Sequence, residues 1–418
     1  MLMLMLSALV SASSVIAKTT MLELDKVASQ VTLHRTQMEF ADYFTHLKKG
    51  GFEQQSELIE SLSSQLVSIP KASLSFCDTV AFDNIQYTLK LANSRLGLLG
   101  RLPASSADYL GSFSKLHEGN KWYAHWLQSW LHADVSTAEL EAIAMSELAD
   151  AKTRRIQLRL SDLPENNAEL NGNDSPAIVS AFKQREQIVY QQIEPVFGVA
   201  FTATEVNISK STLPKSFPAP GIYDPTTQSF IYHLQSDTFP VKQMDWLFLH
   251  EAVPGHHFFS EYAQHRVVCP EYERHQGTTL FTEGWAAYVE TLGHELGLYS
   301  DRTSAEYALD WQALRAVRVL LDIGIHANGW DDNKAKDVWM SHIPDQKNIM
   351  EREINRIRRW PVQVITYVYG KARIKQTIYD IKSRSPDTPL TDIHREILDL
   401  SNFSLRALAH IKALREPL

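Results

Sequence analysis

The eight residues HEAVPGHH at 250–257 constrain this chain more than any other segment. They place two histidines and a glutamate close together, and a second glutamate, Glu283, follows in the run FTEGWAAYVE. Zinc accepts neutral imidazole nitrogen and carboxylate oxygen, and a catalytic zinc site uses three protein ligands and leaves the fourth position to water. We therefore predict His250, His256 and Glu283 as zinc ligands and Glu251 as the general base.

The spacing of the two histidines excludes a regular helix through the motif. In the common motif H-E-x-x-H the second histidine lies four residues after the first, on the same helical face. Here that position holds Pro254, and His256 comes six residues after His250. In an ideal helix His256 would lie about 240° around and about 9 Å along. Because proline removes an intrahelical N–H and Gly255 tolerates unusual backbone angles, we expect a kink or π-type bulge that turns His256 toward His250.

Further runs accompany these two motifs: GNKWYAHWLQ, APGIYDP, ELGLY, RAVRVLLDIGIHANGW and WPVQVITYVYGKARI. Together they resemble a bacterial family known as domain of unknown function 885, over roughly residues 115 to 418, and members of that family look like gluzincin metallopeptidases. The resemblance implies a glutamate ligand on a second helix, which suits the 27 residues between His256 and Glu283. The chain departs from the family pattern at two positions, because Ile357 and Val362 stand where the family usually has tyrosine and often has glycine.

Periodicity and composition predict a mainly α protein. Hydrophobic residues make up 44% of the 418 positions and charged residues 22%, so the chain can bury a large core. Ser136, with Glu139 three residues later, predicts the start of a long helix. Apolar residues recur at helical spacing in the segments 21–67, 80–101, 105–131, 175–196, 304–328, 333–341, 346–358, 361–381 and 391–413.

Two short runs predict strands, TEVNIS at 204–209 and SFIYHL at 229–234, with turn-rich sequence between them. We expect a small sheet beside the zinc-binding helices. The gluzincin resemblance implies a large two-lobed helical fold with a deep central cleft, in which the sheet edge holds an extended substrate by strand addition. No linker divides the chain, so residues 18–418 are expected to form one metallopeptidase-like domain, with an amino-terminal helical lobe at 18–198 and the sheet, zinc motifs and carboxyl-terminal helices at 199–418.

Three downstream residues are candidates for a role beside the metal. Asp322 and His326 lie four residues apart and can meet on one helical face, as an ordinary helical pair also would. The family resemblance implies instead that His326 donates to the oxyanion. Tyr367 is by default a packing residue, but it lies in a run that resembles the family's carboxyl-terminal motif, which implies that its phenol stabilises the oxyanion. Gly370, just after it, would allow a close backbone approach.

Other residues leave two interpretations open. His257 replaces His256 as the second ligand if the bend is shaped differently. Glu290 and His294 lie four residues apart and two turns after Glu283, which suits either an outer partner of the metal or a solvated helix face. Four arginines either clamp a substrate carboxylate by bidentate bonds or form ordinary ion pairs: Arg315, Arg318, Arg356 and Arg373.

The first seventeen residues, MLMLMLSALVSASSVIA, are apolar and then small, as in a signal peptide cleaved near Ala17. No basic residue precedes Lys18, so a buried amino-terminal helix is the alternative. The first interpretation places the protein in the periplasm or outside the cell, the second in the cytoplasm, and the segment is too short for a stable membrane span. Cys77 and Cys269 form no metal motif, and we expect two inert buried thiols rather than a disulfide.

These patterns predict zinc-dependent hydrolysis. Zinc lowers the pKa of its bound water and polarises a carbonyl, while Glu251 takes the proton of that water and passes it to the leaving amine. A metallopeptidase acting on a peptide or small amide is favoured. A zinc hydrolase of a non-peptide amide or ester and a non-enzymatic binding protein that retains the metal site remain open. The net charge of −8, without basic clusters, argues against nucleic acid as a partner, and nothing in the sequence predicts the oligomeric state.

Overall fold

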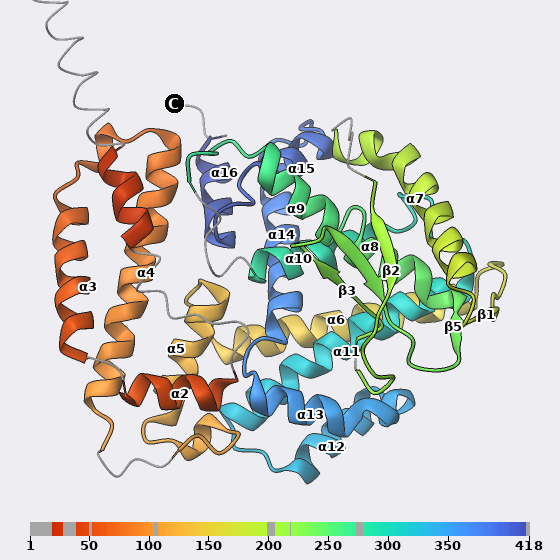
Figure 1. Ribbon diagram of the computed structural model, residues 1–418, viewed down its shortest axis with the longest axis horizontal. Helices are drawn as coiled ribbons and strands as arrows, with labels where there is room; N and C mark the ends of the chain where they lie inside the picture. The colour runs from red at the N-terminus through yellow and green to blue at the C-terminus, as the bar shows by residue number, and fades with distance from the viewer. Residues whose placement is uncertain are drawn as a thin grey trace, which may run out of the picture.

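A computed structural model describes residues 19–27, 39–49, 52–103, 108–198, 205–217, 219–272 and 279–414. The predicted signal peptide at 1–17 lies outside these ranges. Within them the protein is mainly α, with two small β-sheets (Figure 1). None of the described helices is long and apolar enough to cross a membrane.

The α-helices span Phe40–Lys49 (α2), Phe52–Val67 (α3), Phe76–Gly100 (α4), Gly119–Leu131 (α5), Thr137–Arg159 (α6), Ser175–Phe197 (α7), Met244–Glu251 (α8), His256–His265 (α9), Thr279–Val289 (α10), Arg302–His326 (α11), Asp332–His342 (α12), Met350–Arg359 (α13), Ile365–Arg384 (α14), Leu390–Asp399 (α15) and Leu408–Leu414 (α16). The strands span Glu169–Asn171 (β1), Asn207–Lys210 (β2), Gly221–Asp224 (β3), Ser229–Tyr232 (β4) and Thr238–Pro240 (β5).

Side-chain caps define where several helices begin. The hydroxyl oxygen of Ser136 accepts a hydrogen bond from the backbone N–H of Glu139, as predicted for the start of α6. Asp174 and Asp301 cap α7 and α11 in the same way. Two predicted helices are shorter than expected. Residues 108–118 are not α-helical, so α5 begins only at Gly119, and residues 400–407 separate α15 from α16.

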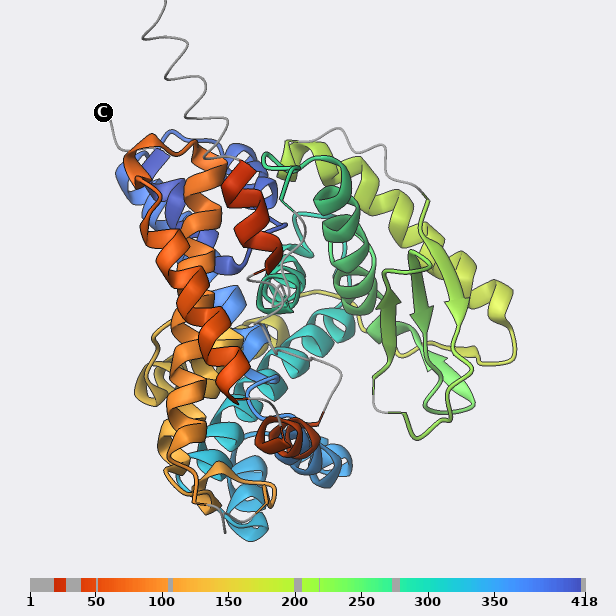
Figure 2. The same cartoon turned by 60° about the vertical axis from the view of Figure 1, so that its left-hand side comes forward.

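The three-stranded sheet has the order β2-β4-β3, with β2 parallel and β3 antiparallel to β4. The two predicted strands correspond to β2 and β4, whereas β3 and the small β1–β5 ladder were not predicted. Figure 2 shows the strands gathered on one flank of the molecule, next to α7. Because β3 packs against α8, the sheet lies beside the helix that carries His250.

Helix α14 lies at the centre of the helical part, where it contacts α5, α6, α10, α11, α15 and α16. Its crossing with α10 is exceptionally close, because a Cβ atom on Gly284 would lie 2.5 Å from Cα of Gly370. The close backbone approach predicted for Gly370 is therefore confirmed. This crossing brings the helix that carries Glu283 onto the helix that carries Tyr367.

The prediction of two free thiols is wrong. Cys77, at the start of α4, and Cys269, just after α9, form a disulfide that joins positions 192 residues apart in sequence. The phenol of Tyr272 also donates a hydrogen bond of 2.6 Å to Asp78, beside the disulfide. The amino-terminal helices are thus bonded covalently to the segment that follows the second metal-motif helix.

Candidate metal centre

The HEAVPGHH segment is a break between two helices, not a kink within one. Helix α8 ends at Glu251, and α9 begins at His256. A Cβ atom on Gly255 would collide with the carbonyl oxygens of Leu249 and His250, so only glycine lets the chain turn back this closely. The predicted bend is present, but its predicted form, a kink or π-type bulge in a continuous helix, is corrected.

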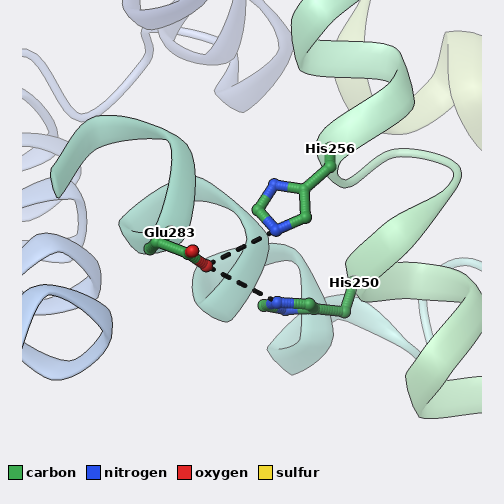
Figure 3. A group of neighbouring side chains, drawn as sticks. All are labelled: His250, His256 and Glu283. Atoms are coloured by element: carbon green, nitrogen blue, oxygen red, sulfur yellow. Dashed lines mark ion pairs between the residues drawn. The ribbon is translucent and has the colours of Figure 1, made fainter. Parts of the chain in front are cut away.

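This turn brings the three predicted ligands together. His250 comes from the last turn of α8, His256 from the start of α9 and Glu283 from α10, and their ligating atoms all lie within 4.8 Å of one another. Nε2 of His250 lies 3.6 Å and Nε2 of His256 3.4 Å from the same carboxylate oxygen of Glu283. Figure 3 shows both imidazoles turned toward that carboxylate.

The chemistry of these three side chains fits a divalent cation. Two nitrogens and one carboxylate oxygen form the donor set of a catalytic zinc site. The carboxylate oxygen of Glu283 that faces the imidazoles is buried and accepts no hydrogen bond from the described residues. Burial raises the pKa of Glu283, but the interaction with His256 outweighs it and holds the pKa at about 2. A buried, ionised carboxylate between two imidazoles is what a bound cation would neutralise.

His250 is oriented from behind by Glu290. Its Nδ1 lies 2.7 Å from a carboxylate oxygen of Glu290, and since a carboxylate only accepts, this nitrogen carries the proton and leaves Nε2 free for a metal. Arg315 donates to both oxygens of Glu290, at 2.7 and 2.6 Å. Burial raises the pKa of Glu290, but Arg315 outweighs this and holds the pKa at about 2. The predicted outer role of Glu290 therefore fits, but its partners are His250 and Arg315, and His294 is exposed.

Glu251 and Tyr367 both line the same cavity as the three ligands. The ring of Tyr367 is nearly parallel to that of His250, with 6.3 Å between their centroids. The guanidinium group of Arg315 lies over the ring of Tyr367, with its central carbon 4.9 Å from the ring centroid. We call His250, His256 and Glu283 the metal group. The predicted base and the predicted phenol thus line the same cavity as the metal group, while their chemical roles stay predictions. His257 is not part of the group, so the geometry selects His256 as the second ligand.

His326 is not brought to the site, and the expectation that it lies beside the metal is corrected. It is fully buried among Tyr109, Phe113 and Tyr123, and its Nε2 lies 3.1 Å from the carbonyl oxygen of Ile357. It lies eleven residues beyond Arg315 on α11, about 16 Å along the helix axis. The middle of α11 lines the cavity with Trp311, Arg315 and Arg318, and the helix carries His326 beyond it.

Asp322 does not pair with His326 either. Its carboxylate accepts hydrogen bonds from the phenol of Tyr123, at 2.8 Å, and from the backbone N–H of Val362, at 2.7 Å. Val362 has a φ of 71°, a left-handed backbone that glycine adopts freely and a β-branched residue does not. This conformation explains why the resembling family often has glycine at the position. Asp322 holds a strained backbone in place, which is a structural role.

The metal group faces a cavity of ≈ 540 Å³. One wall is β3, represented by Gly221, Ile222 and Tyr223. A second part of the lining is rich in arginine: Arg315, Arg318, Arg352, Arg356 and Arg359. Arg352 and Arg359 were missed in the sequence, although they stand four residues before and three after Arg356, on one face of α13. Arg373 lines a different pocket and takes no part in this wall.

Comparison with protein families supports the resemblance seen in the motifs. The model of a family described as bacterial proteins of unknown function, DUF885, matches residues 22–410. The chain belongs to this family. The match extends well upstream of the metal motifs, so the DUF885 unit includes the amino-terminal helices as well as the site. No protein with a curated description matches the chain.

Two solved structures share the fold of this DUF885 chain. A putative lipoprotein from Colwellia psychrerythraea has a TM-score of 0.62 and 19% identity, over 88% of this chain and 64% of that one. A putative lipoprotein of unknown function from Shewanella oneidensis has a TM-score of 0.55 and 16% identity, over 87% of this chain and 72% of that one. The chain therefore spans 64% of the length of the Colwellia protein. At these identities the likeness shows the fold alone.

Proposed function

We propose that this protein is a zinc-dependent metallopeptidase of the gluzincin type. The observation that carries the proposal is the convergence of His250, His256 and Glu283 from three helices at the wall of a cavity, with Glu251 directly after the first ligand. Zinc in such a site acts as a Lewis acid and activates water for attack on a carbonyl carbon. Two histidines and one carboxylate also suit ferrous iron, but the neighbouring Glu251 supplies the base that hydrolysis requires.

Each remaining residue has a task in amide hydrolysis. Glu251 takes a proton from the attacking water as its oxygen bonds to the carbonyl carbon, and delivers it to the leaving amine as the C–N bond breaks. Glu290 keeps Nε2 of His250 unprotonated. Burial raises the pKa of Tyr367, so its phenol keeps the proton at neutral pH and can donate to the oxygen on which negative charge develops.

An extended substrate would lie along β3. This strand pairs with β4 on one side and forms the edge of its three-stranded sheet, and its residues line the cavity together with the arginines. Backbone groups at such an edge can bind a peptide by strand addition. The arrangement supports a peptide as substrate over a compact ester, because the binding surface is a strand edge as well as a pocket.

The test compares the wild type with Glu251→Gln. This change should lower the rate of peptide hydrolysis by about 10²- to 10⁴-fold, while the zinc content per chain, measured by elemental analysis, stays at the wild-type level. Glu261→Gln on α9 is the matched control, because Glu261 is similarly buried but bonds Gln228 outside the cavity. A Glu251→Gln protein that hydrolyses peptides at the wild-type rate would sink the proposal. A panel of ester substrates, run in parallel, separates a peptidase from an esterase.

We also propose that the protein acts outside the cytoplasm, in the periplasm or as a secreted protein. The Cys77–Cys269 disulfide supports this, because disulfides persist in oxidising compartments. The descriptions of the two structurally similar proteins as lipoproteins point the same way.

A further inference from the structure

One of the five arginines that line the cavity, Arg356, forms no ion pair with a carboxylate of the described residues. Arg352, Arg356 and Arg359 lie on one face of α13, and Arg318 comes from α11. Arg315 is paired with Glu290, beside the metal group. Arg359 lies at the exposed rim, 3.5 Å from Glu39. Three guanidinium groups of the lining remain to be explained, those of Arg318, Arg352 and Arg356.

Glu353 is the one carboxylate of the described residues within ion-pair distance of these three groups. Nε of Arg318 donates to Glu353 at 2.8 Å, and both side chains are almost completely buried. Arg352 reaches the same carboxylate only at 3.9 Å, and its buried Nε has no hydrogen-bond partner among the described residues. Arg356 donates to the neutral amide of Gln363, at 2.8 Å. Arg352 is still 36% exposed to solvent. Arg356 is partly buried and has no charged partner at hydrogen-bond distance.

A charged group that is taken from water without a charged partner costs free energy unless an anion binds it. Burial lowers the pKa of the Arg318 guanidinium, and the charge of Arg356 lowers it further despite Glu353. Glu353 is the one carboxylate of the described residues within ion-pair distance of Arg318, and none lies within that distance of Arg356. A carboxylate in the cavity would give Arg356 a charged partner.

Gln363 and Tyr367 connect Arg356 to the metal group. The side-chain amide of Gln363 accepts a hydrogen bond from Arg356 at 2.8 Å and donates one to the phenol oxygen of Tyr367 at 3.4 Å. The ring of Tyr367 lies against that of His250, and all of these residues except Gln363 line the one cavity. A carboxylate held at Arg356 would thus lie in the same cavity as the metal group.

We infer that Arg318 and Arg356 bind a carboxylate of the substrate, and so select peptides that carry a carboxylate close to the bond cleaved. The planar guanidinium fork matches a carboxylate with two parallel hydrogen bonds. This inference rests on the proposed hydrolase function and names the substrate class of the same site. Two sources supply such a group, the free carboxyl terminus of a short peptide and the side chain of Asp or Glu.

Two pairs of tetrapeptides distinguish these sources. The first pair has a free or an amidated carboxyl terminus, and the second pair is amidated and contains Glu or Gln. In one of the two pairs, the peptide with the carboxylate should have a kcat/KM about 10- to 100-fold higher than that of its neutral counterpart. A charged hydrogen-bonded contact stabilises a complex by a factor of about this size. Arg356→Gln should reduce this ratio to near one, and the ratio for Arg356→Lys, which keeps the charge without the fork, should fall between.

Arg373→Gln is the matched control, because Arg373 is exposed on α14 and lines a different pocket. It should keep the wild-type ratio. The inference is overturned if the wild type treats both members of both pairs equally, or if Arg356→Gln slows both members to the same extent. Thermal midpoints of all variants show whether each remains folded.

A binding measurement separates failure of this inference from failure of the proposed function. If the wild type cleaves no peptide, glutarate and its neutral analogue glutaramide are titrated calorimetrically into the wild type, Arg356→Gln and Arg373→Gln, each with its metal. Glutarate should bind and glutaramide should not. The affinity of Arg356→Gln for glutarate should be at least tenfold lower than that of the wild type and of Arg373→Gln. Equal affinity for glutarate in the wild type and Arg356→Gln refutes carboxylate recognition, whatever the peptide assays show.

Discussion

At the scale of single residues, two adjacent imidazoles have different environments. His256 points into the metal group, whereas His257 packs edge-on against Tyr223. We expect His256→Ala to lose most of its bound zinc, because two ligands remain where a catalytic site uses three. His257→Ala is the control and should keep it. Metal content per chain, measured by elemental analysis after gel filtration, decides; full occupancy in His256→Ala would contradict the assignment.

The group of His250, His256 and Glu283 could be predicted from the sequence because so few residue types bind zinc. His250 and His256 flank a proline and a glycine that cannot continue a helix, so their convergence follows from local chemistry. The role of His326 could not be inferred in this way. Its spacing from Asp322 is right for a pair, but the direction in which α11 leaves the cavity is set by packing against distant segments, such as Tyr109 and Tyr123.

Asp322 makes the stability of the protein depend on pH. Burial raises its pKa to about 7, although the bonds from Val362 and Tyr123 lower it. Below pH ~4 the carboxyl is protonated in both the folded and the unfolded chain, and its contribution to stability is complete. Between about 4 and 7 only the unfolded chain releases the proton, so the free energy of unfolding falls by up to about 1.4 kcal/mol per pH unit as the pH rises.

Asp322→Asn replaces this carboxyl group with an amide that does not titrate. We therefore expect the difference in unfolding free energy between the wild type and Asp322→Asn to shift steadily in favour of the variant from pH 4.5 to 7. Urea titrations at several pH values measure the difference, in which changes at the metal ligands cancel. A difference that is the same at every pH would show that Asp322 titrates normally.

At the scale of elements, the site depends on the crossing of α10 and α14. A Cβ atom on Gly370 would lie 2.5 Å from the carbonyl oxygen of Leu280 and 2.6 Å from Cα of Gly284. Gly370→Ala should therefore push α10 outward, destabilise the protein by about 1–3 kcal/mol and weaken zinc binding, because Glu283 moves with the helix. Gly97→Ala is the control. Its Cβ meets only Arg101, at 3.5 Å, and should stabilise α4 by up to about 1 kcal/mol.

Urea unfolding and zinc titration measure both effects. If Gly370→Ala binds zinc as tightly as Gly97→Ala, the crossing does not position Glu283.

Elements with strong local signals were predictable, and those that depend on distant partners were not. The helix after Ser136 follows from its cap, and the arginine stripe of α13 is visible as spacing once the helix is known. Which face of α13 borders the cavity depends on its packing against α11 and α12. Strand β3 was missed because its four residues form a strand only by pairing with β4.

At the scale of the whole molecule, the Cys77–Cys269 disulfide joins parts of the chain that lie 192 residues apart. No local pattern reveals such a pairing, which is why the sequence favoured free thiols. A loop of this length restricts the unfolded chain strongly, so removing the bond should cost about 2–5 kcal/mol of stability. Cys269 follows α9 at the end opposite to His256. The metal group itself should therefore be unaffected.

We accordingly expect the double variant Cys77→Ser/Cys269→Ser to unfold at a clearly lower temperature than the wild type. Its zinc content and its peptidase activity should equal those of the wild type at 20 °C or below, where most proteins are at about their maximal stability. A phosphine reductant should lower the midpoint of the wild type toward that of the variant and leave the variant unchanged, because the variant has no bond to reduce. Equal midpoints for the oxidised wild type and the variant would mean that Tyr272 and Asp78, which link the same two segments, hold them together without the disulfide.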